Sequence, residues 1–306
     1  MNYKKIIITG GSGMVGKSLQ KILPEAVYLS SKDYNLTSRQ EIEKMLNTYN
    51  PDAIVHLAAR VGGILDNIKH PAEYYLDNIL MNTLLIDCSY KFGIKRFIGI
   101  LSSCIYPETA EIYPMTEEIL HNGHPPKTNF AYGYAKRSMA VQIDTYNKQY
   151  DLKYQYLIPC NLYGENDKYG DHNSHFIASL IKKIHLAKKQ KLSEINLLGT
   201  GAPLRQFMHS DDLSFIIKEC LTNDIFENMN VSIKDNLSIK EMAKIALKAC
   251  DADYLKINFD MVSADGQFRK DISIDKLKEY FPDFEPLDLY TGIKQTYEYI
   301  TKNNII

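Results

Sequence analysis

The sequence predicts an α/β protein built on a doubly wound parallel (Rossmann) sheet, with a smaller α/β unit toward its carboxyl end. Two observations carry this prediction. Residues 5–9 form a β-branched run that ends in a glycine-rich turn, and a helical pattern follows to about residue 23. Further short apolar runs then alternate with helical segments as far as about residue 165. Strands that are apolar on both faces are typical of parallel sheets covered by helices.

The amino-terminal half contains five expected strands and the helices that connect them. The strands are expected at residues 5–9, 26–29, 52–57, 95–101 and 155–158. After the first helix, the helices are expected at residues 38–49, 71–92 and 132–150. Ser38 is the type of residue that caps a helix amino terminus, which supports the start of the second helix.

The carboxyl-terminal half alternates less regularly. We expect helices at residues 175–189, 211–221, 238–250, 275–280 and 287–301, and short strands at 195–198 and 207–209. Residues 229–233 are expected to return to the main sheet. The predicted organisation is a dinucleotide-binding domain of residues 1–165 with about 205–233, and a substrate domain of about 166–204 and 234–306.

Composition excludes several classes of function. The 306 residues carry a net charge of −1, so no general attraction to nucleic acid is expected. No apolar run approaches the ~18 residues of a membrane span, and the first strand begins too early to leave room for a signal peptide. The five cysteines lack regular short spacings, which favours a reduced cytoplasmic protein without a structural metal site.

The turn after the first strand is a candidate dinucleotide site. Its glycines allow a tight turn and a close approach of backbone to a pyrophosphate, which the first amides of the following helix attract. The alternative is a purely structural glycine turn, and the flanking strand and helix favour the nucleotide site. The candidate ligands are Gly10, Ser12, Gly13, Met14, Val15 and Gly16, with Leu57, Ala58 and Ala59 after the third strand.

The residues after the second strand bear on the choice of cofactor. An acidic residue there would bind the ribose 2′-hydroxyl and favour NAD. Ser30, Ser31 and Lys32 stand there instead, and a 2′-phosphate fits hydroxyls and an ammonium better. Although Asp33 lies close enough to compete, we predict that the cofactor is NADP, with Lys32 among its ligands.

Tyr132 and Lys136 form a candidate catalytic pair. Side chains four residues apart on a helix lie on the same face, so the ammonium can sit beside the phenol and lower its pKa. Tyr134 points elsewhere. Because a Tyr-x-x-x-Lys pair arises often by chance, the alternative is a surface pair of no function. The glycine turn and the run Ser102 to Pro107 favour catalysis.

Several motifs together resemble the extended short-chain dehydrogenase/reductase superfamily and, within it, the GDP-L-fucose synthase family. They are the glycine turn and residues 57–64, 102–107, 129–137, 173–175, 199–207 and 263–270. The resemblance implies conversion of GDP-4-keto-6-deoxy-D-mannose to GDP-L-fucose with NADPH, by epimerisation at C3 and C5 and reduction at C4. A tryptophan common in the family near Leu198 is absent here, which affects only details of the substrate pocket.

The resemblance also implies roles for individual residues. Tyr132 would protonate the ketone oxygen, Ser102 would hydrogen-bond it, and Lys136 would hold the nicotinamide ribose. Cys104 and His175 would be the base and acid of epimerisation, with His172 a less well placed rival. The cofactor site would further include Tyr132, Lys136, Pro159, Asn161, Leu162 and His175. The substrate site would include Lys183, Arg205, Lys270 and Asn161.

Other readings remain open at this point. The same chemistry could serve another GDP-4-keto sugar, as in a colitose or 6-deoxyheptose pathway. The chain could also be an NADP-binding protein without catalysis, although the intact set of five catalytic residues opposes this. A homodimer through the helices at 71–92 and 132–150 is expected from the resemblance alone.

Overall fold

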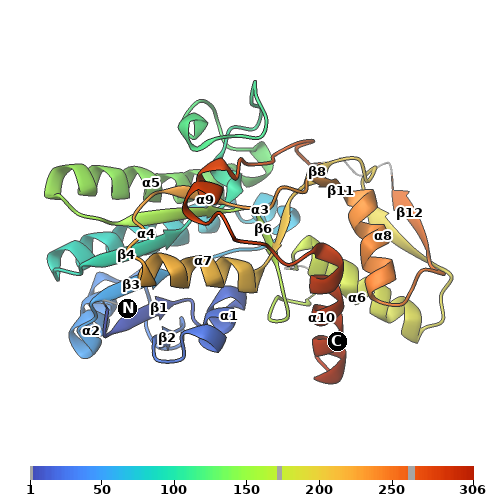
Figure 1. Cartoon of the computed structure of the whole chain (residues 1–306), viewed down its shortest axis with the longest axis horizontal. Helices are drawn as coiled ribbons and strands as arrows, with labels where there is room; N and C mark the ends of the chain where they lie inside the picture. The colour runs from blue at the N-terminus through green and yellow to red at the C-terminus, as the bar shows by residue number, and fades with distance from the viewer. Residues whose placement is uncertain (1–2, 171–173, 261–265) are drawn as a thin grey trace.

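The computed structural model describes residues 3–170, 174–260 and 266–306, and its centre is a six-stranded sheet (Figure 1). The strand order is β10-β5-β4-β3-β1-β2, and every neighbouring pair is parallel. The strands are β1 Ile6–Thr9, β2 Val27–Leu29, β3 Ala53–His56, β4 Arg96–Ile100, β5 Gln155–Pro159 and β10 Met229–Val231. The predicted doubly wound sheet is confirmed, including the return of residues 229–231.

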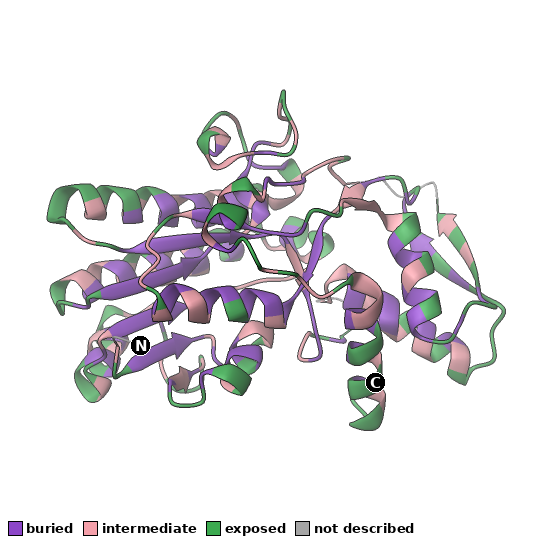
Figure 2. Cartoon of the chain, in the orientation of Figure 1, coloured by how far each residue is buried: buried purple, intermediate pink, exposed green. Residues whose placement is uncertain are grey.

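Helices cover both faces of this sheet. On one face α1 (Met14–Ile22) packs against α7 (Ser210–Thr222). On the other, α4 (Pro71–Lys91) lies between α2 (Arg39–Tyr49) and α5 (Phe130–Tyr150). Figure 2 shows the strands buried and the outer helix faces exposed. The predicted cap is present, since the Ser38 side chain accepts a hydrogen bond from the Glu41 amide.

The direction of winding reverses between β1 and β3. The chain moves from β1 to β2 at one edge, then crosses back to place β3 on the opposite side of β1. In open α/β sheets, ligands bind beyond the carboxyl ends of the strands at such a switch point. The glycine turn after β1 and residues 57–59 after β3 both lie there.

The remaining strands form three two-stranded pairs. The parallel pairs are β6 (Asn161–Tyr163) with β9 (Phe207–His209) and β7 (Glu194–Leu198) with β12 (Lys256–Asp260). β8 (Leu204–Arg205) and β11 (Leu237–Ser238) are antiparallel. The sequence analysis missed β12, because its alternate residues are the exposed Lys256, Asn258 and Asp260, and lysine, asparagine and aspartate are depleted in strands. No strand is predicted at β6 either.

Buried apolar side chains gather in two clusters. The first surrounds the central sheet and includes Ile272, Leu277 and Phe281 from near the carboxyl end. The second lies among α6 (Phe176–Lys189), α8 (Ile239–Ala249) and α10 (Leu289–Lys302). In Figure 1 these three helices stand at one end of the molecule. The remaining helices are α3 (Ile64–Lys69), α9 (Asp275–Tyr280) and 3-10 turns at Ser103–Ile105, Glu117–Ile119 and Lys127–Asn129.

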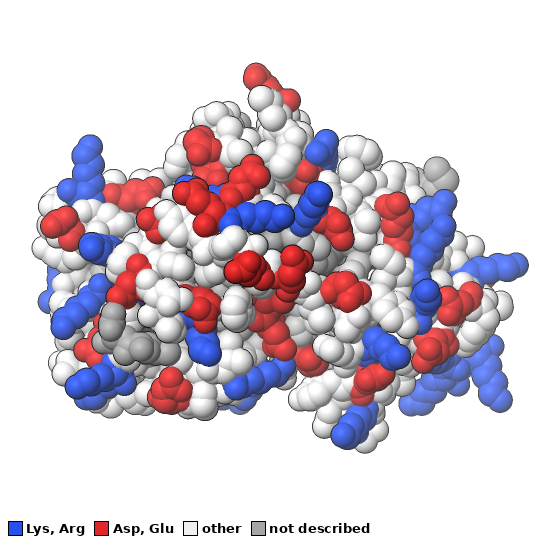
Figure 3. Space-filling model, in the orientation of Figure 1, with Lys and Arg blue, Asp and Glu red and all other residues white. Residues whose placement is uncertain are grey.

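Surface charge is mixed. Figure 3 shows acidic and basic side chains interspersed over most of the viewed face, with Lys and Arg more frequent toward the end that carries α6 and α8. Of the helices in the described ranges, none has the length and apolarity needed to cross a bilayer.

Candidate active site

The glycine turn is shaped by close backbone contacts. Gly10 has a φ of +73°, and a Cβ atom there would lie 2.7 Å from the Ala58 amide nitrogen. A Cβ at Gly16 would lie 2.5 Å from the Gly11 carbonyl oxygen. The N-cap of α1 is Gly13, which offers no side chain to cover the first-turn amides. The turn therefore presents bare backbone donors at the switch point, and these fit a pyrophosphate.

In the loop after β2, the acidic side chain of Asp33 accepts hydrogen bonds from the same loop. Both the amide and the hydroxyl of Ser30 donate to Asp33 Oδ2, each over 2.7 Å. These hydrogen bonds hold the pKa of Asp33 below its usual range. Lys32 is exposed beside them, and its amide donates to Ser30 Oγ over 3.2 Å. The carboxylate that could have bound a ribose hydroxyl is thus occupied within the loop.

A buried polar chain connects the switch point to the catalytic helix, and sequence reasoning missed it. His56 is fully buried at the end of β3, with Nδ1 2.8 Å from Thr9 Oγ1 and Nε2 3.1 Å from Asn82 Oδ1. The Asn82 amide nitrogen in turn donates to the Ala135 carbonyl over 3.2 Å. Burial, with the charge of Lys136 nearby, lowers the pKa of His56 to about 3. The neutral imidazole therefore serves as a fixed link between β1, β3, α4 and α5.

The segment after β4 delivers Ser102 and Cys104 beside Tyr132. Ser102 caps the 3-10 turn, and its Oγ accepts from the Cys104 amide over 3.3 Å. Tyr132 is 8% exposed in the first turns of α5. Its pKa is raised by burial first and by the electrostatic effect of Cys104 second, while a hydrogen bond with Ser102 lowers it. The thiol, the hydroxyl and the phenol therefore lie near one another.

The structure corrects one sequence prediction about this pair. Lys136 was expected to lower the pKa of Tyr132, but burial dominates and the pKa of Tyr132 is raised. The Lys136 ammonium instead donates to the Ile100 carbonyl over 2.8 Å, and burial lowers its own pKa to about 7. Desolvation disfavours the charged forms of both groups.

Tyr74 lies against Tyr132, and sequence reasoning did not single it out. The two rings meet edge to face with centroids 6.4 Å apart. Tyr74 donates to Asp66 Oδ2 over 2.6 Å, and the guanidinium of Arg60 lies 5.4 Å from its ring centroid. A Cβ at Gly62 would lie 2.2 Å from the Tyr74 hydroxyl. The motif at residues 60–63 therefore packs around the tyrosine that supports Tyr132.

Lys270 reaches the same place from a distant part of the chain. Its Nζ lies 3.7 Å from Cys104 Sγ, although Lys270 is predicted from the family resemblance as a residue of the substrate site. Cys104 is half-buried, whereas Cys88, Cys160, Cys220 and Cys250 are buried. The described structure thus places an ammonium against the most accessible thiol.

His175 stands at the N-cap of α6 with a buried carboxylate as partner. Its Nδ1 lies 2.9 Å from Asp167 Oδ1; the carboxylate is 3% exposed and the imidazole 37% exposed. The hydrogen bond with Asp167 is the main cause that raises the pKa of His175, against the opposing effect of burial. Asp167 was read only as part of a polar loop, since nothing in the local sequence marks it as a partner. The rival His172 and neighbouring Asn173 lie outside the described residues.

The other predicted ligands have structural contacts. The Asn161 amide donates to the Gln206 carbonyl over 2.8 Å and so joins β6 to the segment before β9. Lys183 donates to the Asn196 carbonyl over 2.8 Å. Arg205 donates to the Leu204 and Phe268 carbonyls. Pro159 ends β5, Leu162 lies within β6, and Ser12 is exposed in the glycine turn. Part of the motif 263–270 lies outside the described residues.

Glu165, His209 and Asp211 bring their ligand-type atoms within 4.8 Å of one another. However, His209 Nδ1 accepts a hydrogen bond from the Asp211 amide, which leaves the proton of the neutral ring on Nε2. Lys21 fills the cluster, with Nζ 3.6 Å from Glu165 Oε2 and 3.0 Å from Asp211 Oδ2. The group is better described as an ion-paired contact between α1 and α7 than as a metal site.

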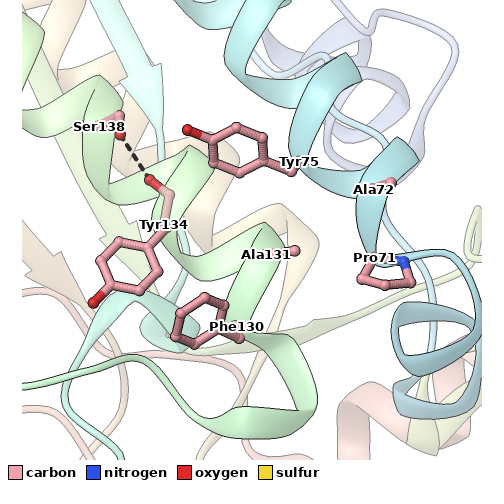
Figure 4. Close-up of a pocket in the computed structure, with 7 residues that line it drawn as sticks. All are labelled: Pro71, Ala72, Tyr75, Phe130, Ala131, Tyr134 and Ser138. Carbon is pink, nitrogen blue, oxygen red and sulfur yellow. Dashed lines mark hydrogen bonds between the residues drawn. The ribbon is translucent and has the colours of Figure 1, made fainter.

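A separate hollow lies on the outer face of α4 and α5 (Figure 4). It is lined by Pro71, Ala72, Tyr75, Phe130, Ala131, Tyr134 and Ser138. The Tyr134 hydroxyl lies 2.6 Å from His124 Nδ1. Tyr134 therefore points away from Lys136, as predicted from its position in the helix. Its lining includes none of the candidate catalytic residues.

Comparison with known proteins shows which family the chain belongs to. The model of the NAD dependent epimerase/dehydratase family matches residues 6–232, which span the sheet and the catalytic segments. The chain belongs to that family. Within the family, it is 35% identical to a GDP-L-fucose synthase of Dictyostelium discoideum, over 98% of this chain and 96% of the relative. The resemblance seen in the sequence is therefore confirmed.

Two further members of the family are similar over nearly their whole length. A GDP-L-colitose synthase of Yersinia pseudotuberculosis is 33% identical, over 98% of this chain and 99% of the relative. A solved structure of a GDP-L-fucose synthetase from Naegleria fowleri bound to NADP superposes with a TM-score of 0.90 at 30% identity, covering 99% of this chain and 94% of that one.

Proposed function

We propose that the protein is a bifunctional epimerase and reductase that converts GDP-4-keto-6-deoxy-D-mannose to GDP-L-fucose with NADPH. One observation supports this most directly: Cys104 lies beside Ser102, and both residues act on the pKa of Tyr132. A simple ketoreductase needs the hydroxyl and the phenol, but it has no use for a thiol beside them. The similarity to GDP-L-fucose synthases supports the same conclusion.

The proposed cofactor site uses the switch point. The amides after Gly13 would hold the pyrophosphate, and the exposed Lys32 would bind the 2′-phosphate that distinguishes NADP from NAD. The bare turn fits this role, because a Cβ at Gly10 or Gly16 would clash with backbone. When bound, NADPH supplies the hydride that reduces C4. We place the ligands Leu57, Ala58, Ala59, Pro159, Asn161 and Leu162 along the same edge of the sheet.

In the reduction, the chain itself has to protonate the ketone oxygen. Tyr132 gives its phenolic proton to that oxygen, and Ser102 donates a hydrogen bond to it. Lys136 holds the nicotinamide ribose and, when charged, stabilises the phenolate that remains. The raised pKa of Tyr132 keeps the phenol protonated until the substrate needs it.

In the epimerisation, a proton leaves one face of the sugar and another arrives on the opposite face. The Cys104 thiolate removes a proton from the carbon next to the C4 ketone, and the electron pair moves onto the ketone oxygen. Ser102 and Tyr132 stabilise that enolate by hydrogen bonding. His175 then gives its Nε2 proton to carbon, since Asp167 holds Nδ1. Exchange with water restores thiolate and imidazolium.

The GDP group requires positive charge outside the catalytic residues. We propose Lys183 and Arg205 as ligands of the diphosphate, with Asn161 near the sugar. A GDP-L-colitose synthase is among the similar relatives, so the second candidate function is the same chemistry on another GDP-4-keto sugar. Turnover measured on a panel of such sugars with NADPH distinguishes the two, and mass analysis identifies each product.

Isotope exchange tests the epimerase function directly. In heavy water without NADPH, the enzyme is expected to introduce deuterium at C3 and C5 of the keto sugar. Cys104→Ser should nearly abolish exchange, because a serine hydroxyl is a much weaker base than a thiolate. His175→Asn should reduce exchange or remove the inversion. The matched control is Cys250→Ala, which removes a buried thiol in the second apolar cluster.

A Cys104→Ser enzyme that exchanges and epimerises at the normal rate would contradict the assignment. The protein would then be a 4-ketoreductase that depends on Ser102, Tyr132 and Lys136. Absence of turnover on every keto sugar, despite tight NADPH binding, would instead favour a non-catalytic NADP-binding protein.

Oligomeric state and location are further parts of the proposal. The outer face of α4 and α5 exposes Tyr75, Leu76, Phe130 and Val141, at 45%, 54%, 50% and 47%. Such apolar side chains suit a homodimer through these two helices, and sedimentation at micromolar concentration tests it. We expect a cytoplasmic enzyme in which residues 166–204 and 234–306 form the substrate domain.

A further inference from the structure

Lys270 and Cys104 are 166 residues apart in the chain, yet the structure places Nζ 3.7 Å from Sγ. The backbone on each side of Lys270 is held in place. Phe268 accepts a hydrogen bond from the Leu204 amide over 2.8 Å, and the Asp271 carbonyl accepts from the Met115 amide over 2.9 Å. Lys270 is therefore positioned by the fold rather than by its own flexible side chain.

The neighbouring side chains reinforce that position. Arg269 forms a two-contact ion pair with the buried Asp271, at 2.6 and 2.9 Å. Successive residues of an extended chain point to opposite sides. The ion pair with Asp271 turns the Arg269 side chain away from the site, so the Lys270 side chain faces the site. On the other side of the contact, the Ser102 cap fixes the backbone of Cys104.

Three segments place groups near the thiol. Tyr132 on α5 is a neutral phenol, because burial raises its pKa. Ser102 before the 3-10 turn is an uncharged hydroxyl. Lys270 also lies near Cys160, a buried thiol after β5 whose pKa burial raises and Lys270 partly lowers. Lys270 supplies the positive charge among them. The charge acts across a half-buried space, where water screens it less than at the surface.

We propose that Lys270 is the positioning residue that keeps Cys104 in its thiolate form, and that it thereby makes Cys104 the base of the epimerisation. The inference rests on the proposed function and adds to it. When the thiolate forms, the Sγ proton passes to water and the Lys270 ammonium keeps all its protons. The adjacent positive charge stabilises the new negative charge on sulfur. Asp167 is a negative group beside His175, and it favours the positively charged imidazolium. Lys270 and Asp167 therefore favour a negative Cys104 and a positive His175.

The test measures the thiol itself and needs no substrate. Iodoacetamide alkylates thiolates, so the alkylation rate of Cys104 reports the thiolate fraction. The rate is followed on the intact protein by mass analysis of the Cys104 peptide, between about pH 6 and about pH 10. Lys270→Met should slow alkylation near neutral pH by roughly tenfold, and the two curves should converge at high pH, where every accessible thiol is ionised. Lys270→Arg should restore most of the rate.

Controls separate this effect from misfolding and from failure of the proposed function. Lys278→Met removes an exposed lysine on α9 and should leave the rate unchanged. If Lys270→Met does not fold, Lys270→Gln provides the same comparison. Because alkylation is measured without a keto sugar, the result holds whichever sugar is the substrate.

Two outcomes would overturn the proposal. Equal alkylation rates in the unmodified protein and Lys270→Met at every pH would show that the ammonium has no effect on the thiol. A Lys270→Arg rate as low as that of Lys270→Met would show that a positive charge at this position is not what acts on the thiol. Lys270 would then be assigned to the substrate site only, as the sequence alone suggested.

Discussion

The Lys136 ammonium donates a hydrogen bond to the Ile100 carbonyl over 2.8 Å, at the carboxyl end of β4. This contact joins the helix that carries Tyr132 to the strand that leads into Ser102. Lys136 is 2% exposed, and burial lowers its pKa to about 7 from the ordinary 10.5. Burial therefore makes the charged form of this lysine unfavourable.

Lys136→Met should change how stability depends on pH. The folded-state pKa of Lys136 lies below the unfolded value, so unfolding takes up a proton between about pH 7 and about 10.5. Stability should rise with pH across that window, and the cost of burying the ammonium is fully present below it. Urea unfolding of Lys136→Met should show a smaller rise. The exposed Lys148→Met on the same helix should retain the original slope.

Tyr132→Phe should separate the two activities. It removes the proton donor of the reduction but leaves Cys104 and His175 in place. Reduction should fall by about 10²–10⁴-fold, the contribution typical of a positioned acid, while epimerisation falls less. NADPH oxidation and deuterium exchange measure the two steps. Tyr134→Phe, whose hydroxyl bonds His124 instead, is the matched control, and equal loss of both steps would mean that the roles are wrongly assigned.

Asp167→Asn should alter the pH dependence of epimerisation. Asp167 raises the pKa of His175, so the imidazolium needed as the acid persists to higher pH. Without the carboxylate, that pKa should fall, and exchange should decline at a lower pH than in the unmodified enzyme. The profile of deuterium exchange against pH measures this. An unchanged profile would exclude His175 as the acid, and Asp283→Asn on an exposed turn serves as the control.

Lys32→Ala should weaken the preference for NADPH. Because Asp33 is engaged by Ser30, Lys32 is left as the charged group for a 2′-phosphate. The KM for NADPH should rise more than the KM for NADH, whereas Lys44→Ala on α2 should change neither. Better turnover with NADH than with NADPH in the unmodified enzyme would show that the loop after β2 does not select for a 2′-phosphate.

Local patterns in the sequence were sufficient to predict the sheet and the main motifs. The β-branched run before Gly10 and the glycines after it predict a strand, a turn and a helix, because each feature depends on neighbouring residues. The same holds for Tyr132 and Lys136, which helical spacing alone brings to one face. The strand β12 was missed because its exposed alternate residues are polar, and its pairing with β7 compensates for weak local preference.

The sequence by itself determined the fold class, the dinucleotide turn and the tyrosine–lysine pair. Only the tertiary structure decided the electrostatic environment of those groups, which sets their pKa values. The pKa of Tyr132 is raised rather than lowered because burial removes water from around it. Lys270 meets Cys104, and His56 links Thr9 to Asn82, across separations of 166, 47 and 26 residues. Desolvation and long-range contact depend on which segments the fold brings together, and no local spacing encodes them.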